Sequence, residues 1–178
     1  RNDKKGPKMP FTCFTDETRA LHDALDNRVA RGVMASNAVF KKFRLALSVT
    51  GEYTQYHGGT VNDALQAMNA TMTRVNGIYA IDLAVKLELI ANTNLVVYTN
   101  PNTDPYSPAT SMTNWNGQLQ ANLNSVIGNA NYDIGHLFGA TGGGGDAGCI
   151  GCVCVANEKG SGITSPSNGQ PEGDSFDI

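Results

Sequence analysis

The chain has 178 residues, of which 40% are hydrophobic and 16% are charged, and its formal net charge is -3 at pH 7. This length suits one domain with a buried core and leaves too little for two. The slight negative charge excludes the broad basic surface that binding to nucleic acid requires, and no apolar run is long enough to span a bilayer. We therefore expect one globular domain with no nucleic-acid partner and no membrane span.

Residues 1–40 differ in character from the rest and are predicted to be a leader or propeptide-like segment. They begin with the polar stretch RNDKKGPKMP, and DETRALHDALDNRVARGV can form a helix. Arg28 and Arg31 would make an accessible cleavage site if this segment is removed during maturation. Residues 41–178 are then expected to form the main domain.

The stretch from Phe43 to Ile90 is predicted to fold as a strand, a long helix and a second strand. FRLALSV alternates at a period of two, which is typical of a half-buried strand. Thr60 can cap the helix, and Asp63 can return the reciprocal hydrogen bond. Apolar residues then recur at helical spacing, at Val61, Leu65, Met68, Met72, Val75 and Tyr79. From Val85 the period returns to two, so we expect a second strand beside the first, with the helix against the sheet.

Two segments around this unit are interpreted as loops. GEYTQYHGG is predicted to connect the first strand to the helix, and its His57 is interpreted as a surface or packing residue. After the second strand, LVVYT is predicted to be a further short strand. NPNTDPYSPATSMTN has three prolines and is predicted to be a surface loop too polar to pack. Such oxygen-rich loops sometimes hold calcium, but this one lacks the carboxylate pattern of a dedicated calcium site.

A second helix and further strands follow. Apolar residues recur at helical spacing from Trp115 to Ile127, and Gly128 ends the run as a C-cap residue does. YDIGHLFGA alternates like a strand, and a hydrogen bond within the core explains His136 better than a catalytic role does. GITSP is predicted to be one more short strand before a turn-rich tail.

The glycine run TGGGGDAG lies between the strand YDIGHLF and the strand-like segment CIGCVCVA. A phosphate-binding loop is disfavoured because no helix begins right after the glycines and no lysine accompanies them. An exposed sheet edge that pairs with an extended peptide is the better functional interpretation. A merely flexible loop stays open as the alternative.

Three of the four cysteines are packed into CIGCVC, whereas Cys13 stands alone near the start. The chain lacks the second pair of a zinc ribbon, so disulfides in a secreted protein are favoured over a local metal site or free thiols. Cys149 or Cys152 could close a small loop, with Cys154 reaching a distant partner, but sequence alone cannot choose the pairing. The abundance of Asn, Thr, Ser and Gly after Asn92 agrees with a secreted protein.

The order of these segments resembles the amino-terminal part of the reprolysin-like zinc metallopeptidases, a metzincin group, and in particular its bacterial secreted members. The resemblance runs from about Phe43 to Ile178 and rests on FRLALSVTGEYTQYHGG, TRVNGIYAIDLAVKLELI, YDIGHLF, the glycine-rich segment through CVC, and GDSFDI. It implies an α/β fold with a mixed twisted sheet and two main helices, the amino-terminal subdomain of a metzincin. It also implies a secreted zinc metalloendopeptidase.

In that family the next element is a helix carrying HExxHxxGxxH, whose three histidines bind zinc and whose glutamate is the general base. None of His22, His57 and His136 lies in such a context. The zinc ligands are therefore expected beyond Ile178, and this chain alone is expected to lack catalytic residues and to be inactive. Its partners would be a peptide or protein substrate and the remainder of the catalytic domain, either continuous with it or a separate nicked chain.

By the same resemblance, Gly144, Gly145, Asp146 and Ala147 belong to the edge strand that pairs with substrate. Cys13 is a candidate metal ligand, since latent metzincins use a propeptide cysteine to occupy the open zinc position. A nonenzymatic secreted module that binds extended peptides at the same edge is the alternative function. A phosphate-binding α/β domain built on TGGGGD is a third hypothesis.

Overall fold

The structure is a computed structural model that describes residues 12–13 and 39–177. Its sheet has the order β1-β5-β6-β4-β2-β3, with β5 and β6 antiparallel and the other neighbours parallel. The strands are β1 (Thr12–Cys13), β2 (Lys41–Val49), β3 (Val85–Leu89), β4 (Ile134–Phe138), β5 (Gly144–Asp146) and β6 (Gly162–Ser165). The helices are α2 (Gly51–Tyr56), α3 (Val61–Asp82), α4 (Trp115–Val126) and α5 (Asp174–Asp177), with short 3-10 turns η1 (Thr93–Val96), η2 (Ala109–Asn114) and η3 (Asn129–Asn131).

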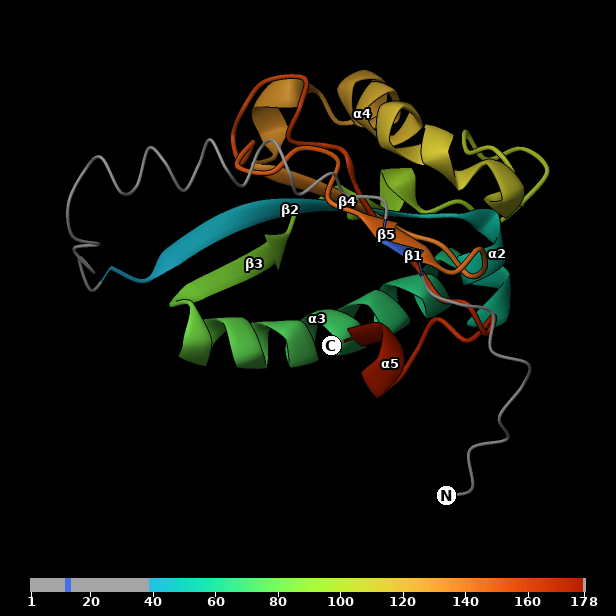
Figure 1. Cartoon of the computed structure of the whole chain (residues 1–178), viewed down its shortest axis with the longest axis horizontal. Helices are drawn as coiled ribbons and strands as arrows, with labels where there is room; N and C mark the ends of the chain where they lie inside the picture. The colour runs from blue at the N-terminus through green and yellow to red at the C-terminus, as the bar shows by residue number, and fades with distance from the viewer. Residues whose placement is uncertain (1–11, 14–38, 178) are drawn as a thin grey trace.

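The elements form three layers. Helix α4 lies over one face of the sheet, and α3 and α5 lie over the other (Figure 1). This arrangement confirms the predicted α/β fold with a mixed sheet and two main helices. The described residues contain no helix with the length and hydrophobicity that crossing a bilayer would require.

The predicted strand, helix and strand are confirmed as β2, α3 and β3. Helix α3 begins after Thr60, whose Oγ1 accepts a hydrogen bond from the Asp63 backbone N–H at 3.2 Å. The Asp63 carboxylate in turn accepts one from the Thr60 N–H at 3.3 Å, which completes a capping box. Strands β2 and β3 pair in parallel, so the long helix between them is the crossover that such a pair requires.

Replacing Thr60 with alanine is expected to lower the free energy of unfolding by about 1 kcal/mol, because the Asp63 N–H at the start of α3 loses its side-chain acceptor. Urea denaturation followed by circular dichroism measures the change. Thr73→Ala is the matched control, since Thr73 lies within the same helix and bonds only the carbonyl of Asn69. Equal losses in the two variants would contradict a specific capping effect.

The prediction that β2 is half-buried is wrong. Leu45, Leu47 and Val49 pack on the α3 side, but Ala46 and Ser48 on the opposite side are also fully buried. The reason is that β2 is an inner strand, and η1 and the loop before α4 cover its second face through Val96 and Tyr106. Ala46 and Ser48 are small enough to fit beneath these segments, but neither is hydrophobic enough for the sequence to predict its burial.

The core is divided by the sheet into two clusters. The cluster under α3 contains Met68, Met72 and Phe138, together with the α3-facing residues of β2. The cluster under α4 contains Trp115, Leu119, Leu123, Tyr132, Leu137 and Ile163. Because both faces carry a full apolar layer, the sheet is held from both sides in the way expected of a largely parallel sheet.

Two predicted assignments next to β2 are wrong. GEYTQYHGG contains helix α2, whose cap Thr50 accepts a hydrogen bond from the Tyr53 N–H at 3.3 Å. LVVYT forms η1 and then a single bridge between Val49 and Val97, not a strand. Strand β2 is already paired with β3 and β4, so only its end is left for another partner.

The polar loop before α4 packs more deeply than its composition predicts. Tyr106 is 8% exposed and Met112 is 4% exposed. The Tyr106 hydroxyl lies 2.7 Å from Ser48 Oγ and accepts a hydrogen bond from Asn122 Nδ2 at 3.0 Å. Burial is the main cause of the raised pKa of Tyr106. The loop therefore belongs to the core on the α4 side.

Candidate functional site

The residues expected to pair with substrate lie in and just after one short strand. Gly144–Asp146 form β5, and Ala147 follows its end. β5 pairs antiparallel with β6, with Gly144 opposite Ser165. Gly142 and Gly143 lead into the strand with φ of 114° and 69°, which a residue with a side chain adopts only under strain. The end of the glycine run therefore forms strand β5.

The strand predicted in CIGCVCVA is wrong. Residues 147–161 form turns and bends between β5 and β6. Gly148, Gly151, Cys154 and Asn157 all have positive φ, which interrupts the regular backbone that a strand needs. We call residues 147–161 the cysteine loop.

The edge of β5 that faces away from β6 is paired with β1. The pairing is parallel, with Thr12 opposite Gly144 and Cys13 opposite Gly145. The edge that the sequence predicts to be exposed is therefore occupied by a strand from the leader-like segment. The Cys13 side chain and the predicted helix and cleavage site within residues 14–38 lie outside the described residues, so these points stay predictions.

A cavity of about 440 Å³ lies between α3 and the face of the sheet that carries His136. Its lining is largely aliphatic and aromatic and includes Leu47, Val75 and Phe138, all from α3, β2 and β4. Helix α5 borders it through Phe176, whose ring meets Phe138 edge-on with 4.9 Å between centroids.

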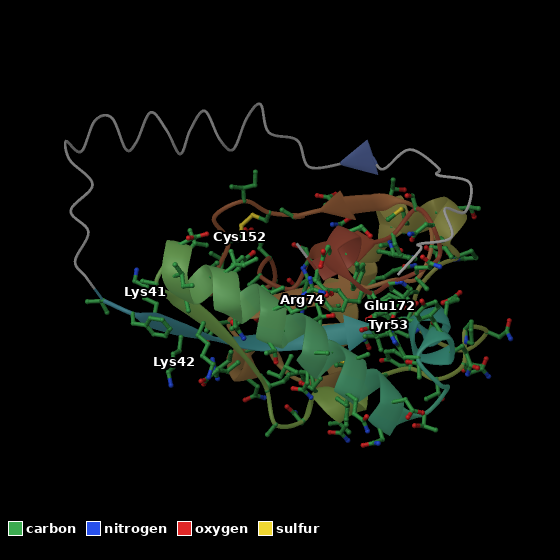
Figure 2. The ribbon with its side chains drawn as sticks, turned by 90° about the horizontal axis from the view of Figure 1, so that it is seen from below. Lys41, Lys42, Tyr53, Arg74, Cys152 and Glu172 are labelled. Atoms are coloured by element: carbon green, nitrogen blue, oxygen red, sulfur yellow. A yellow bond between two sulfur atoms is a disulfide. The ribbon has the colours of Figure 1, made fainter. Side chains whose placement is uncertain are left out.

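Helix α5 is attached to α3 by polar contacts. Arg74, labelled in Figure 2, pairs with Asp174 and Asp177, and the second contact measures 3.0 Å. Thr71 Oγ1 donates to the Asp177 carboxylate at 2.8 Å. These contacts fix the last described turn of the chain beside the apolar cavity.

His136 is partly buried and hydrogen-bonded within the fold, as the sequence predicts. Its Nε2 lies 2.9 Å from Thr164 Oγ1, and its ring meets Phe138 edge-on at 5.5 Å. Burial without a charged partner lowers the pKa of His136 to about 4. The imidazole is therefore neutral near pH 7.

His57 lies elsewhere, at the end of α2. Its Nε2 is 3.2 Å from the Pro171 carbonyl oxygen, and its ring centroid is 4.5 Å from that of Tyr53. His57 is thus a packing residue. The two histidines that the structure describes do not fit the three-histidine zinc site of the metzincins.

In the oxygen-rich loop before α4, the carboxylate of Asp104 accepts hydrogen bonds from the protein backbone. Asp104 accepts hydrogen bonds from the backbone N–H of Gly51 at 2.7 Å and of Tyr106 at 3.0 Å. Burial raises the pKa of Asp104, while these two bonds oppose the rise. Because both oxygens already have donors, this loop offers little to calcium.

The cysteine loop contains a disulfide between Cys149 and Cys152, seen beside the Cys152 label in Figure 2. The small loop predicted for one of these residues is confirmed. Cys154 is an exposed free cysteine, so its predicted distant partner is wrong. Sequence reasoning missed Glu158, which lies against both bonded sulfurs. A carboxylate six residues after a CxxC pair was the only available signal.

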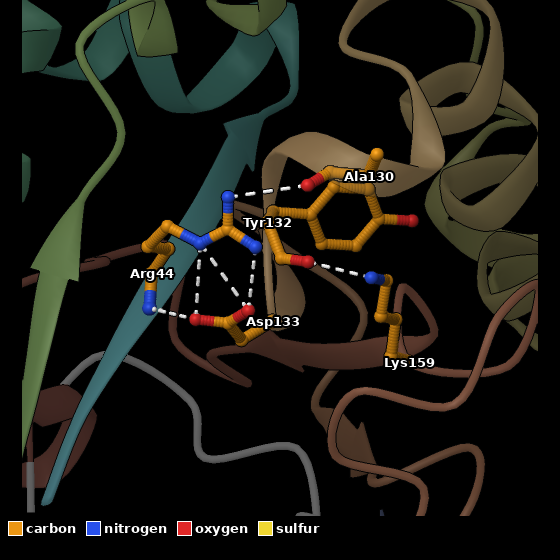
Figure 3. A network of polar contacts seen from close by, with 5 residues as sticks. All are labelled: Arg44, Ala130, Tyr132, Asp133 and Lys159. Atoms are coloured by element: carbon orange, nitrogen blue, oxygen red, sulfur yellow. Dashed lines mark hydrogen bonds and ion pairs between the residues drawn. The ribbon is translucent and has the colours of Figure 1, made fainter.

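Polar contacts tie the cysteine loop to the start of β4 (Figure 3). Arg44 pairs with Asp133 at 2.7 Å. The Cys154 N–H donates to the Asp133 carbonyl at 2.9 Å. Lys159 Nζ donates to the Tyr132 carbonyl at 2.6 Å. The hydrogen bond from Arg44 is the main reason that the pKa of Asp133 is lowered. The loop after β5 is therefore anchored at its far end.

Comparison with known proteins identifies a family. The profile of the reprolysin-like metallopeptidase family M12B matches residues 23–178, which is most of the chain. No curated protein matches the sequence significantly. The family match extends into the predicted leader, and the boundary at residue 40 stays a prediction.

Proposed function

The chain belongs to the reprolysin-like metallopeptidase family M12B, and we propose that it forms the sheet scaffold and substrate-pairing edge of a secreted zinc metalloendopeptidase. The family supports metal-dependent peptide hydrolysis as the activity. Such peptidases are often extracellular, and the disulfide of the cysteine loop fits an oxidising compartment. The bacterial secreted type within the family is part of this proposal.

The observation that carries the proposal is the pairing at β5. A short strand made largely of glycine leaves the backbone accessible to another extended chain, since few side chains obstruct the approach. β1 already lies along this edge as an added strand. In the proposal a substrate pairs with Gly144, Gly145, Asp146 and the following Ala147 through its backbone, which is strand addition.

The family's zinc is assigned to polypeptide outside this chain. Among the described residues, Cys149, Cys152 and Glu158 make up the one group of three potential ligands that lie close together, and it contains no histidine. In the proposal the zinc ligands lie beyond Ile178, and the 178-residue chain alone does not hydrolyse peptides. The apolar cavity beside α5 offers a surface against which the remainder of the catalytic domain can pack.

β1 supports a latent form of the enzyme. It comes from the segment predicted to be a propeptide, and it pairs with the residues that we assign to substrate binding. Substrate would have to displace β1 from β5, so occupancy of the edge and binding of substrate are mutually exclusive. In this proposal Cys13 contributes through its place in β1, and its thiol is a further candidate ligand for the zinc.

Replacing Cys13 with proline tests the strand pairing, because proline removes a backbone N–H and restricts the chain. We expect hydrogen exchange at Gly144–Asp146 to accelerate roughly tenfold, as the loss of about one hydrogen bond implies. Binding of a fluorescent extended peptide should strengthen in parallel. Exchange and peptide binding are measured on the 178-residue chain.

Cys13→Ala is the matched control, since it removes the thiol and keeps the N–H. In this chain it should leave both exchange and peptide binding unchanged. In the complete protein, increased proteolysis by Cys13→Ala before maturation would support the thiol as a zinc ligand. Unchanged exchange in Cys13→Pro would contradict the role of β1 as occupant of the substrate edge.

A nonenzymatic peptide-binding module is the second candidate, favoured by the lack of a histidine ligand set among the described residues. The coding sequence downstream of Ile178 distinguishes the two. An HExxHxxGxxH motif there supports the peptidase, and a continuous reading frame without one supports the binding module.

A further inference from the structure

Glu158 points at the two sulfurs of the cysteine loop. Its Oε2 lies 3.1 Å from Cys152 Sγ and 3.7 Å from Cys149 Sγ. One ligand atom from each of the three residues lies within 4.8 Å of the others. Cys152 is 8% exposed, whereas Glu158 is open to solvent, so the cluster is reachable from one side.

The Glu158 carboxylate receives no hydrogen bond from the disulfide. An ionised carboxylate only accepts hydrogen bonds, and bonded sulfurs carry no proton to donate. The ion pairs among the described residues do not include Glu158. The neighbouring Lys159 is directed away, because its Nζ bonds the Tyr132 carbonyl and lies 4.7 Å from the centre of the Tyr132 ring.

The distances suit a small thiophilic cation once the sulfurs are free. Tetrahedral zinc has bonds of about 2.3 Å to sulfur and about 2.1 Å to oxygen, which sets sulfur–oxygen separations of about 3.6 Å. The observed 3.1 Å and 3.7 Å lie on either side of that value. The Cα atoms of Cys149 and Cys152 are 5.6 Å apart, and CxxC is a spacing that zinc sites use.

The backbone of the loop holds the three residues in place. The Val155 N–H donates to the Cys152 carbonyl at 2.9 Å, and the Lys159 N–H donates to the Val155 carbonyl at 3.1 Å. Ser161 Oγ donates to the Glu158 carbonyl at 2.8 Å. These turns return the chain from Cys152 so that Glu158 faces the sulfurs.

We propose that Cys149, Cys152 and Glu158 form a redox-gated site for a thiophilic divalent cation of the zinc class. A phosphine reductant opens the site. The phosphine takes oxygen from water to become a phosphine oxide, the S–S bond breaks, and the two protons of that water go to the sulfurs. The cation then displaces both thiol protons and binds two thiolates and the carboxylate, with water completing the coordination. The cysteine loop is closed by the disulfide when oxidised and by the cation when reduced.

Cobalt(II) titration of the 178-residue chain tests the proposal, because tetrahedral cobalt reports thiolate ligands through a near-ultraviolet charge-transfer band. The chain reduced with a phosphine should bind one cobalt ion with this band, and zinc should abolish it. The oxidised chain should show no band. Glu158→Gln should weaken binding to the reduced chain by roughly tenfold or more, since a charged ligand is lost.

Cys154→Ser is the matched control, because Cys154 lies in the same loop and outside the cluster. It should retain full cobalt affinity and the same band. A second measurement needs no variant: zinc should protect Cys149 and Cys152 of the reduced chain from alkylation, mapped by mass spectrometry, and leave Cys154 reactive. The proposal is overturned by a reduced chain without the band, by an unchanged affinity in Glu158→Gln, by a lost band in Cys154→Ser, or by protection of Cys154 instead of the CxxC pair.

Discussion

Replacing Gly135 with alanine is expected to lower the free energy of unfolding by about 3 kcal/mol, because the new methyl group has no space. A Cβ at this position would lie 2.4 Å from Leu123 Cδ1 and 2.6 Å from the Gly160 Cα atom. Leu123 is fully buried, and Gly160 is backbone that cannot rotate away. The Gly135 N–H also donates to the Lys159 carbonyl at 2.7 Å, so the cysteine loop and β4 cannot separate without losing that bond.

Gly77→Ala is the control for the Gly135 variant. Gly77 lies within α3, and no atom lies within 4 Å of a Cβ built there. Alanine at that site should raise the free energy of unfolding by about 1 kcal/mol through helix propensity alone. Urea denaturation of both variants gives the comparison. A Gly135→Ala protein as stable as the wild type would show that α4 and the cysteine loop can move apart freely.

Lowering the pH from 7 to 4 is expected to remove up to about 3 kcal/mol of stability through His136 alone. The pKa of His136 is lowered to about 4 in the folded protein by burial. The unfolded chain takes up a proton near pH 6.5 and the folded protein does not, so unfolding binds protons between these values. Stability is therefore fully present above about pH 6.5 and is lost as the pH falls toward 4.

His136→Gln isolates this effect, because glutamine does not titrate and can still bond Thr164. Urea denaturation at several pH values should show a shallower loss of stability in the variant between pH 6.5 and 4. Asp177 lines the same cavity and Asp133 titrates at low pH, so the difference between wild type and variant is the informative quantity. His57→Gln controls for the loss of a histidine. Parallel curves for the wild type and His136→Gln would rule out a buried neutral His136.

Elements whose signals are local could be predicted well. The capping pair Thr60 and Asp63 sets the start of α3, and the change of period at Val85 marks β3. The family resemblance likewise rests on local segments, and the match over residues 23–178 confirms it. Each of these features depends on residues that are close together in the sequence. It can therefore be recognised from the sequence alone.

Other features depend on partners far away in the chain. The buried Ser48 bonds Val96 and Tyr106, about 50 residues further along the chain, and the helix in GEYTQYHGG packs Gly51 against the backbone at Pro101. The glycine run shows no strand pattern, because its strand exists through pairing with β6 and β1 and not through side chains. The position of Glu158 against the CxxC pair has the same origin, since consecutive turns bring it back.

The sequence by itself determined the family, the α/β class and the order of the main strands and helices, since these follow from periodicity, capping and motif order along the chain. Only the tertiary structure decided that β1 lies on the edge of β5, that both faces of β2 are covered, and that Glu158 meets the two cysteines. The physical reason is that backbone pairing and turn geometry do not depend strongly on side-chain identity. The pairing of a glycine-rich strand, or a turn that brings two residues together, can therefore be recognised only from the three-dimensional structure.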